Sequence, residues 1–196
     1  MPLAFPSHQG LVLPVCAWFP GRFDAVASCV GAAMPDIVDA AAWPLRGELG
    51  QWLGHSLLGV VAACVPVGLA VDALVRRAVP RALLGWLEPR AARPALGCAA
   101  LSVGVGALSH VAFDLVTHGN LLLFWPWYTD DHAFPAWWYH SFFGIPLPVY
   151  REPYPFAPHT IAWLALTVLG AWLFVRYLRR GQRKPPKNRH QPGASR

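Results

Sequence analysis

The chain has 196 residues, of which 55% are hydrophobic and only 13% are charged, and it contains 10 Trp and 20 Pro. This balance is too apolar for an ordinary soluble domain and points to a membrane protein. The formal net charge of +6 would suit a nucleic-acid binder. The basic residues flank long apolar runs, however, so we interpret them as determinants of membrane topology and expect no nucleic-acid partner.

Two short apolar stretches, residues 10–19 and 23–34, come first and are separated by Pro20-Gly21-Arg22. Each is too short to cross about 30 Å of hydrocarbon as a helix. We expect a helical hairpin that dips into the membrane and brings His8 and Asp36 to the same membrane face. The alternative is a single Pro-kinked span, which would place these two side chains on opposite faces and leave the arginine of the turn at mid-span, where a charge is costly.

Residues 37–52 are expected to form a short polar connection to the first of three longer apolar runs. Each run has about the 20 residues that a spanning helix needs, and the runs cover residues 53–75, 96–117 and 158–178. The aromatic-rich stretch 124–143 is typical of an interfacial belt. The predicted fold class is therefore an all-α membrane protein, with an N-terminal helical hairpin, about three full transmembrane helices and an interfacial aromatic segment.

Basic residues lie on one predicted side of the membrane. Five arginines lie between the first two long runs and eight Lys or Arg residues lie in or after the end of the third, whereas the loop 119–157 has Arg151 as its one basic residue. By the positive-inside rule, the basic segments and the C-terminus face the cytoplasm. We expect one membrane-embedded helical domain over residues 1–180, followed by a disordered basic tail over 181–196.

Several polar or thiol groups are expected to be structural. Asp72 precedes Arg76 by four residues, the ordinary spacing of a helical ion pair. Asp39 is a weaker metal-ligand candidate than Asp36. The four cysteines sit singly in apolar stretches without C-x-x-C spacing, so we interpret them as small buried hydrophobic residues.

The most informative motif is ALSHVAFDLVTHG, in which His110, Asp114 and His118 recur every four residues. On a helix each is turned only about 40° from the last, so all three share one face. An Asp inside a spanning helix costs about 2.5–3.5 kcal/mol and usually faces an internal cavity. His110 and Asp114 are about 6 Å apart along the axis and can bind one ion, whereas the two histidines are about 12 Å apart and cannot share one.

Two ligands do not hold a metal, but the predicted topology brings further ligand-type side chains to the same membrane face. The expected metal ligands are His8, Asp36, His55, His110 and Asp114. Imidazole and carboxylate together suit zinc best here, and also manganese or iron. His118 is expected to serve a second ion or to act as the catalytic proton shuttle. A hydrogen-bonded polar cluster or a proton relay, neither of which needs a metal, is the alternative.

The motifs S-H, M-P-D, H-S-L-L-G and G-A-L-S-H-x-x-x-D-x-x-T-H-G resemble, over most of residues 1–178, a family of uncharacterised bacterial integral membrane proteins classed as a domain of unknown function. More distantly, the chain resembles the inner-membrane metal-dependent hydrolases regulated by LexA, whose motifs run P-D-I-D-H, H-R-G-x-T-H-S and S-H-x-x-x-D. Val38 stands where that family has its second carboxylate, and Gly50, Gln51 and Trp52 replace its H-R-G.

The order His, Asp, His, His-x-x-x-Asp is further similar to the all-helical zinc-dependent phospholipase C class. That resemblance implies a second zinc ion on His8, bridged by Asp114, and places His118 near the ligands of a third. It also implies a first zinc ion on Asp36, His55, His110 and Asp114. The H-x-x-x-E of that class is absent from this sequence.

We therefore expect a membrane-bound metal-dependent hydrolase of phosphoester bonds in a lipid-type substrate. It would act at the extracytoplasmic face of a bacterial inner membrane, with membrane lipid as its partner. The sequence has no P-loop, H-E-x-x-H motif or nucleophile elbow, so NTP chemistry, zincin proteolysis and acyl transfer are unsupported. The alternative is a non-catalytic integral membrane protein in which the same cluster is a structural metal site or a polar cluster.

Overall fold

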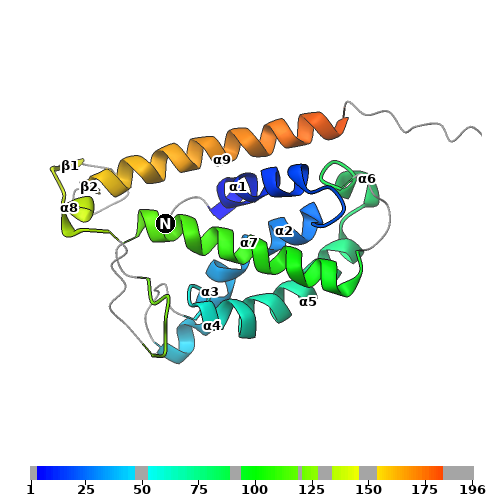
Figure 1. The fold of residues 1–196 in the computed structure, drawn as a ribbon, viewed down its shortest axis with the longest axis horizontal. Coiled ribbons are helices and arrows are strands. Elements are labelled where there is room, and N and C mark those ends of the chain that lie inside the picture. Colours follow the sequence, from blue (N-terminus) through cyan, green and yellow to red (C-terminus); the bar gives the residue numbers. More distant parts are fainter. Residues whose placement is uncertain are drawn as a thin grey trace, which may run out of the picture.

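The computed structural model describes residues 4–46, 53–88, 94–118, 121–127, 134–145 and 154–182. Its long helices pack side by side, with α7 between α9 on one side and α5 on the other (Figure 1). The helices are α1 (Ala4–Trp18), α2 (Ala25–Gly31), α3 (Met34–Arg46), α4 (Leu57–Gly59), the π-helical η1 (Val60–Cys64), α5 (Val65–Ala78), α6 (Arg81–Leu84), α7 (Leu96–Thr117), α8 (Ala136–Tyr139) and α9 (Pro158–Gln182). Two short strands, β1 (Phe143–Ile145) and β2 (Tyr154–Phe156), form an antiparallel pair.

Four helical stretches are long and apolar enough to cross a membrane, where the sequence predicted about three. Leu57–Ala78, Leu96–Thr117 and Pro158–Arg180 correspond to the three predicted runs, and Ala25–Ala42 is the additional stretch. The predicted polar connection over residues 37–52 is wrong in its first part, because α3 continues the helical path to Arg46. Residues 47–52 and the predicted tail from residue 183 onward lie outside the described residues.

The N-terminal segment forms two helices, α1 and α2, joined by a turn (Figure 1). Gly21 has φ 94° in this turn, in the left-handed region that favours glycine. Asp24 then caps α2 by accepting a hydrogen bond from the Ala27 amide at 2.8 Å. The single kinked helix is therefore wrong, and His8 and Asp36 do lie at the same end of the molecule.

Glycines permit a close approach between α2 and α7. A Cβ on Gly106 would lie 2.2 Å from the Ser28 carbonyl oxygen, and a Cβ on Gly31 would lie 2.1 Å from the Val103 carbonyl oxygen. A larger residue at either position would force the helices apart. Next to this contact a buried cluster surrounds Met34, whose side chain is fully buried. The position of α2 on α7 is what sets the backbone of residue 32 beside the His110 ring.

The outward surface of the bundle is largely apolar, as expected for helices that face lipid. In the membrane-spanning stretch of α9, only 6% of the residues are buried inside the protein. Large side chains are exposed on several helices, among them Val61 at 71%, Leu101 at 53% and Val168 at 61%. This exposure fits a membrane protein, in which lipid covers such a surface.

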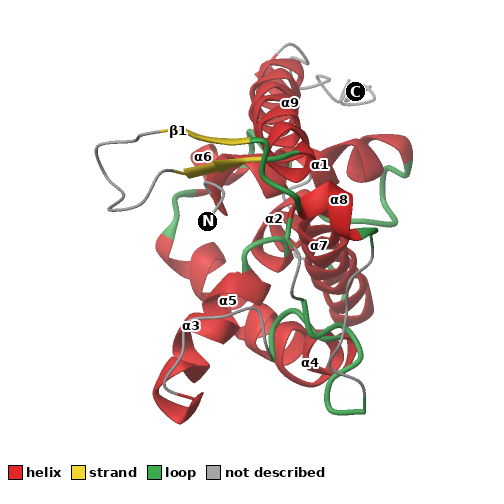
Figure 2. Ribbon diagram, turned by 90° about the vertical axis from the view of Figure 1, so that its left-hand side faces the viewer, coloured by secondary structure: helices red, strands yellow, loops and turns green. Residues whose placement is uncertain are grey.

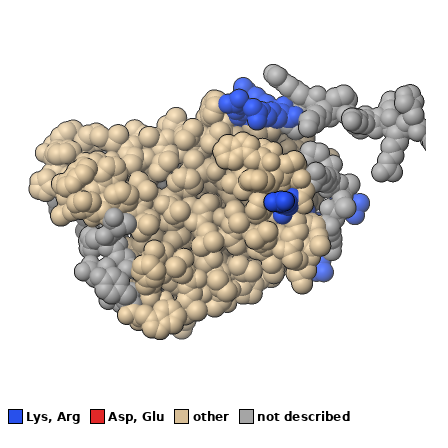
Figure 3. Space-filling view, viewed as in Figure 1, with Lys and Arg blue, Asp and Glu red and all other residues tan. Residues whose placement is uncertain are grey.

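The described parts of the basic segments lie at one end of the bundle, where α5, α6 and the C-terminal part of α9 come together (Figures 1 and 3). The predicted pair of Asp72 and Arg76 is confirmed, with the guanidinium Nε donating to Asp72 at 2.8 Å. Arg76 also donates to Asp24, and the side chains of both carboxylates are less than a tenth exposed. This buried network ties α5 to the start of α2, a link that local spacing does not reveal.

The aromatic segment lies at the opposite end and contacts the end of α7 (Figure 2). The Trp138 indole donates to the Val116 carbonyl oxygen at 2.8 Å, and the Leu57 amide donates to the Leu123 carbonyl oxygen at 2.9 Å. Trp127 and Trp137 are 79% and 61% exposed. The described part of this segment therefore covers the helix ends with aromatic side chains, while residues 128–133 lie outside the described residues.

Candidate metal centre

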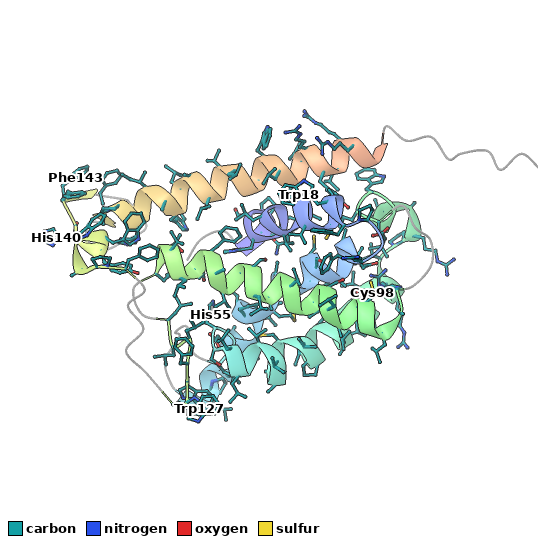
Figure 4. All side chains as sticks on the ribbon, viewed as in Figure 1. Trp18, His55, Cys98, Trp127, His140 and Phe143 are labelled. Carbon is teal, nitrogen blue, oxygen red and sulfur yellow. The ribbon has the colours of Figure 1, made fainter. Side chains whose placement is uncertain are left out.

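Four predicted ligands converge where α3, α4 and α7 meet. Asp36 comes from the first turn of α3 and His55 from the residues just before α4. His110 and Asp114 come from successive turns of α7, as their spacing requires. One ligand atom from each of the four lies within 4.8 Å of the others. Figure 4 labels His55 below α7, away from the end of the molecule that carries Cys98.

The distances between these ligand atoms are short and similar. His55 Nε2 lies 3.3 Å from His110 Nε2, 3.2 Å from Asp114 Oδ2 and 3.8 Å from Asp36 Oδ1. His110 Nε2 lies 3.3 Å from Asp114 Oδ2 and 3.6 Å from Asp36 Oδ1. Tetrahedral zinc with bonds of about 2.0–2.1 Å places its ligand atoms about 3.3–3.4 Å apart. These five distances therefore fit a tetrahedral ion of this size, and the carboxylate oxygens of Asp36 and Asp114 lie within 4.8 Å of each other.

The outer nitrogen of each imidazole fixes which way the ring points. His110 Nδ1 donates to the Ala32 carbonyl oxygen at 2.7 Å, and His55 Nδ1 donates to Asp39 Oδ2 at 2.7 Å. A carbonyl and a carboxylate only accept, so the proton of a neutral ring sits on Nδ1 and the lone pair on Nε2. Metal-binding histidines use such partners for the same purpose.

This arrangement leaves two Nε2 lone pairs facing each other beside two carboxylates. The two Nε2 atoms are 3.3 Å apart and carry no proton, so they repel each other unless a proton or a cation lies between them. The side chains of His55 and His110 are 1% and 0% exposed, so bulk water does not reach the space between the rings. Either one ring is an imidazolium, or a metal ion occupies the centre. The whole donor set is the nitrogen and oxygen combination that zinc uses.

Asp39 was predicted to be a weaker ligand candidate than Asp36, and in the structure it lies behind His55 and outside the four-ligand cluster. Besides His55, its carboxylate accepts a hydrogen bond from the Gly54 amide, so it positions both the ring and the backbone next to it. A signal was available, because Asp36 and Asp39 are three residues apart and share one face of a helix. The polar connection expected over this segment hid that relation.

The other oxygen of Asp114 faces the two remaining predicted residues. His8 Nε2 lies 3.6 Å from Asp114 Oδ1, and His118 Nδ1 lies 3.7 Å from the same atom. The His8 ring also stacks on His110 with centroids 3.9 Å apart. Asp114 thus has Oδ2 toward the four-ligand cluster and Oδ1 toward a second pair of imidazoles.

His8 and His118 differ in their access to solvent. The His8 side chain is 5% exposed, and burial, helped by the nearby His110, lowers the pKa of His8 to about 4. His118 has a side chain that is 24% exposed, and partial burial lowers its pKa below the usual value. Both rings are therefore neutral at pH 7, and His118 is the one that can exchange protons with the surroundings.

The prediction that His118 shares the helical face of Asp114 needs one correction. Helix α7 ends at Thr117, and His118 follows in an extended conformation with φ −129° and ψ 141°. Its ring reaches back to Thr117, with Nδ1 3.0 Å from the hydroxyl oxygen.

Comparison with curated proteins and with solved structures found no match. A family model, described as a domain of unknown function, DUF4184, matches residues 1–193, which is nearly the entire chain. This agrees with the resemblance to an uncharacterised family that the motifs indicated. The chain therefore belongs to the DUF4184 family.

Proposed function

We propose that this protein is a membrane-bound metal-dependent hydrolase of phosphoester bonds in a lipid-type substrate. The observation that carries the proposal is the convergence of Asp36, His55, His110 and Asp114, whose ligand atoms all lie within 4.8 Å of one another. Zinc is the preferred ion, since the nitrogen and oxygen donors and their spacing match its tetrahedral geometry. The more distant resemblance to the LexA-regulated membrane hydrolases also supports this class.

A metal ion at this position would generate a nucleophile from water near neutral pH and polarise the phosphoryl oxygen. The protein's own groups would do the rest. Asp39 and the Ala32 carbonyl oxygen hold the two rings in position. His118, neutral and partly exposed next to Asp114, is proposed to transfer the proton to the leaving group. His8 is proposed as a further ligand on the Asp114 Oδ1 side.

The place of the cluster supports a membrane-surface reaction. Its carboxylate Asp36 is 32% exposed, which gives a substrate access from outside the bundle. The cluster lies away from the C-terminal end of α5, which carries Arg76 (Figure 1), and by the positive-inside rule that end would face the cytoplasm. The proposed site of action is therefore the extracytoplasmic face of a bacterial inner membrane, with the C-terminus in the cytoplasm.

One observation favours a second candidate function. Structural zinc sites are closed by four protein ligands, whereas catalytic sites usually keep one position for water. The cluster offers four protein ligands, and three of them, His55, His110 and Asp114, are buried. A non-catalytic membrane protein with a structural metal is therefore the alternative proposal, and it predicts bound metal without turnover.

Metal analysis of the detergent-purified protein tests both proposals. The wild type should hold at least one equivalent of metal, and Asp114→Asn and His110→Ala should hold far less. Asp72→Asn is the matched control, because it removes a buried carboxylate at the other end of the bundle. Sub-stoichiometric metal in the wild type, or equal metal in all four proteins, would contradict a metal centre.

A turnover assay then distinguishes the proposed hydrolase from a non-catalytic protein with a structural metal. With a chromogenic phosphodiester presented in mixed micelles, the wild type should show metal-dependent hydrolysis that Asp36→Asn abolishes and Asp72→Asn retains. Stoichiometric metal with no turnover of phosphodiester or phosphomonoester substrates would favour the structural site.

A further inference from the structure

The outer face of α9 carries two adjoining shallow, open hollows that lie outside the metal centre. The first is apolar and is lined by Ile161, Leu164, Ala165, Val168, Leu169 and Trp172. The second begins at the same tryptophan and is lined by Trp172, Val175, Arg176, Arg179 and Arg180. The spacing of three and four residues places them on one stripe of the helix. Apolar lining thus passes directly into a basic patch.

The basic end of this stripe is preorganised and uncompensated. The Arg176 guanidinium carbon lies 4.9 Å from the centre of the Trp172 ring, a cation–π contact. Within the described part of the chain, no carboxylate pairs with Arg176, Arg179 or Arg180, and all three are exposed. Figure 3 shows this basic patch in blue at the end of α9. The patch therefore presents three guanidinium groups to an external anion.

We infer that this stripe is a binding site for one anionic phospholipid. The phosphate would bind the guanidinium groups, which suit its geometry, and an acyl chain would lie in the apolar hollow. From Ile161 to Arg176 the helix rises roughly 22 Å, more than the approximately 15 Å depth of one leaflet. Trp172 lies at the junction of the two parts, where an amphipathic ring favours the membrane interface.

A second copy of the chain is a poorer occupant of this face. Two copies with the same membrane orientation would bring their α9 stripes together in parallel. Arg176, Arg179 and Arg180 would then meet the same three arginines, and like charges at close range repel. Charge complementarity therefore favours an anionic lipid over self-association.

Native mass spectrometry in a non-ionic detergent tests the site with two lipids of equal chain length, phosphatidylglycerol and phosphatidylcholine. The wild type should retain one phosphatidylglycerol in preference to phosphatidylcholine. The double variant Arg176→Gln, Arg180→Gln should bind phosphatidylglycerol roughly 25-fold more weakly, at about fivefold for each arginine. The matched control is Arg77→Gln with Arg81→Gln, which removes two exposed arginines at the same end of the bundle and should change binding less than threefold.

The acyl chain is tested separately by phosphatidylglycerol brominated in its chain, which quenches nearby tryptophan. Trp172→Phe should reduce the quenched fraction of the emission. Equal retention of both lipids, an equal loss in the control pair, or quenching unchanged by Trp172→Phe would each overturn the site. A lipid-free dimer that dissociates when Val168 is replaced by arginine would show that a second copy occupies the face.

Discussion

Replacing Asp39 with asparagine is expected to weaken metal binding without removing any proposed ligand. Asp39 Oδ2 accepts the Nδ1 proton of His55 at 2.7 Å, and the carboxylate charge makes the opposite nitrogen a stronger base. The asparagine oxygen can still accept this hydrogen bond, but the asparagine NH2 group would then face the Gly54 amide, which now donates to the second carboxylate oxygen. The expected effect therefore combines the loss of the carboxylate charge with the loss of one hydrogen bond.

Loss of such an outer partner typically costs 10–100-fold in metal affinity, which is about 1.4–2.7 kcal/mol of binding free energy. Because the bond is short and the Asp39 side chain is only 8% exposed, we expect a value in the upper half of that range. The assay is competition for zinc between the detergent-purified protein and a chromogenic chelator, with the dissociation constant fitted for each variant.

Asp72→Asn serves as the control, since it also neutralises a buried carboxylate, but one paired with Arg76 at the far end of the bundle. It should leave the zinc dissociation constant within about twofold of the wild type. Gel filtration and thermal unfolding would establish that both variants fold. An unchanged affinity in Asp39→Asn, or an equal loss in Asp72→Asn, would refute the assignment of Asp39 as the partner that tunes His55.

Three other perturbations test the packing and the charge networks. Gly106→Leu should push α2 away from α7 and so lower the free energy of unfolding by about 1–3 kcal/mol in a denaturant titration. The same displacement should weaken zinc binding. Gly97→Leu is the control, because the Cβ of that position meets open space, and it should change neither quantity. Zinc affinity should fall as the pH is lowered, because the carboxylates of Asp114 and Asp39 outweigh burial and raise the pKa of His55, so that protons compete with the metal already near neutrality. A zinc affinity that does not change between pH 8 and pH 5 would argue against histidine ligands. Arg76→Gln should lower the free energy of unfolding by about 3–5 kcal/mol, because it removes the cation that pairs with two buried carboxylates. Arg77 is exposed, so Arg77→Gln should change the free energy of unfolding by no more than about 0.5 kcal/mol in the same titration.

The sequence by itself determined the features that depend on residues close together along the chain. Apolar runs of about 20 residues identified three of the four candidate spans, because membrane insertion depends on summed side-chain hydrophobicity. The i,i+4 rule identified His110 with Asp114 and Asp72 with Arg76, because a helix fixes such neighbours by its own geometry. The turn at Pro20-Gly21-Arg22 was also predictable, since proline and glycine impose it on the backbone.

Helix boundaries beyond these runs were less predictable. The segment that forms α3 has a mixed composition with Asp36, Asp39 and Pro44, which suggested a connection rather than a helix. The predicted run over residues 96–117 matches the bounds of α7, whereas the shared helical face was wrongly extended to His118, the residue that follows the helix. Local propensity is a weak guide wherever tertiary contacts select the conformation.

Only the tertiary structure decided which partners meet across the sequence. Asp39 reaches His55 over 16 residues, Arg76 reaches Asp24 over 52, and His110 reaches the Ala32 carbonyl oxygen over 78. The last of these pairs depends on how closely α2 packs on α7, which glycines at positions 31 and 106 permit. The sequence by itself therefore determined which residue types could bind a metal, whereas the packing of the helices decided which atoms face one another and at what distance.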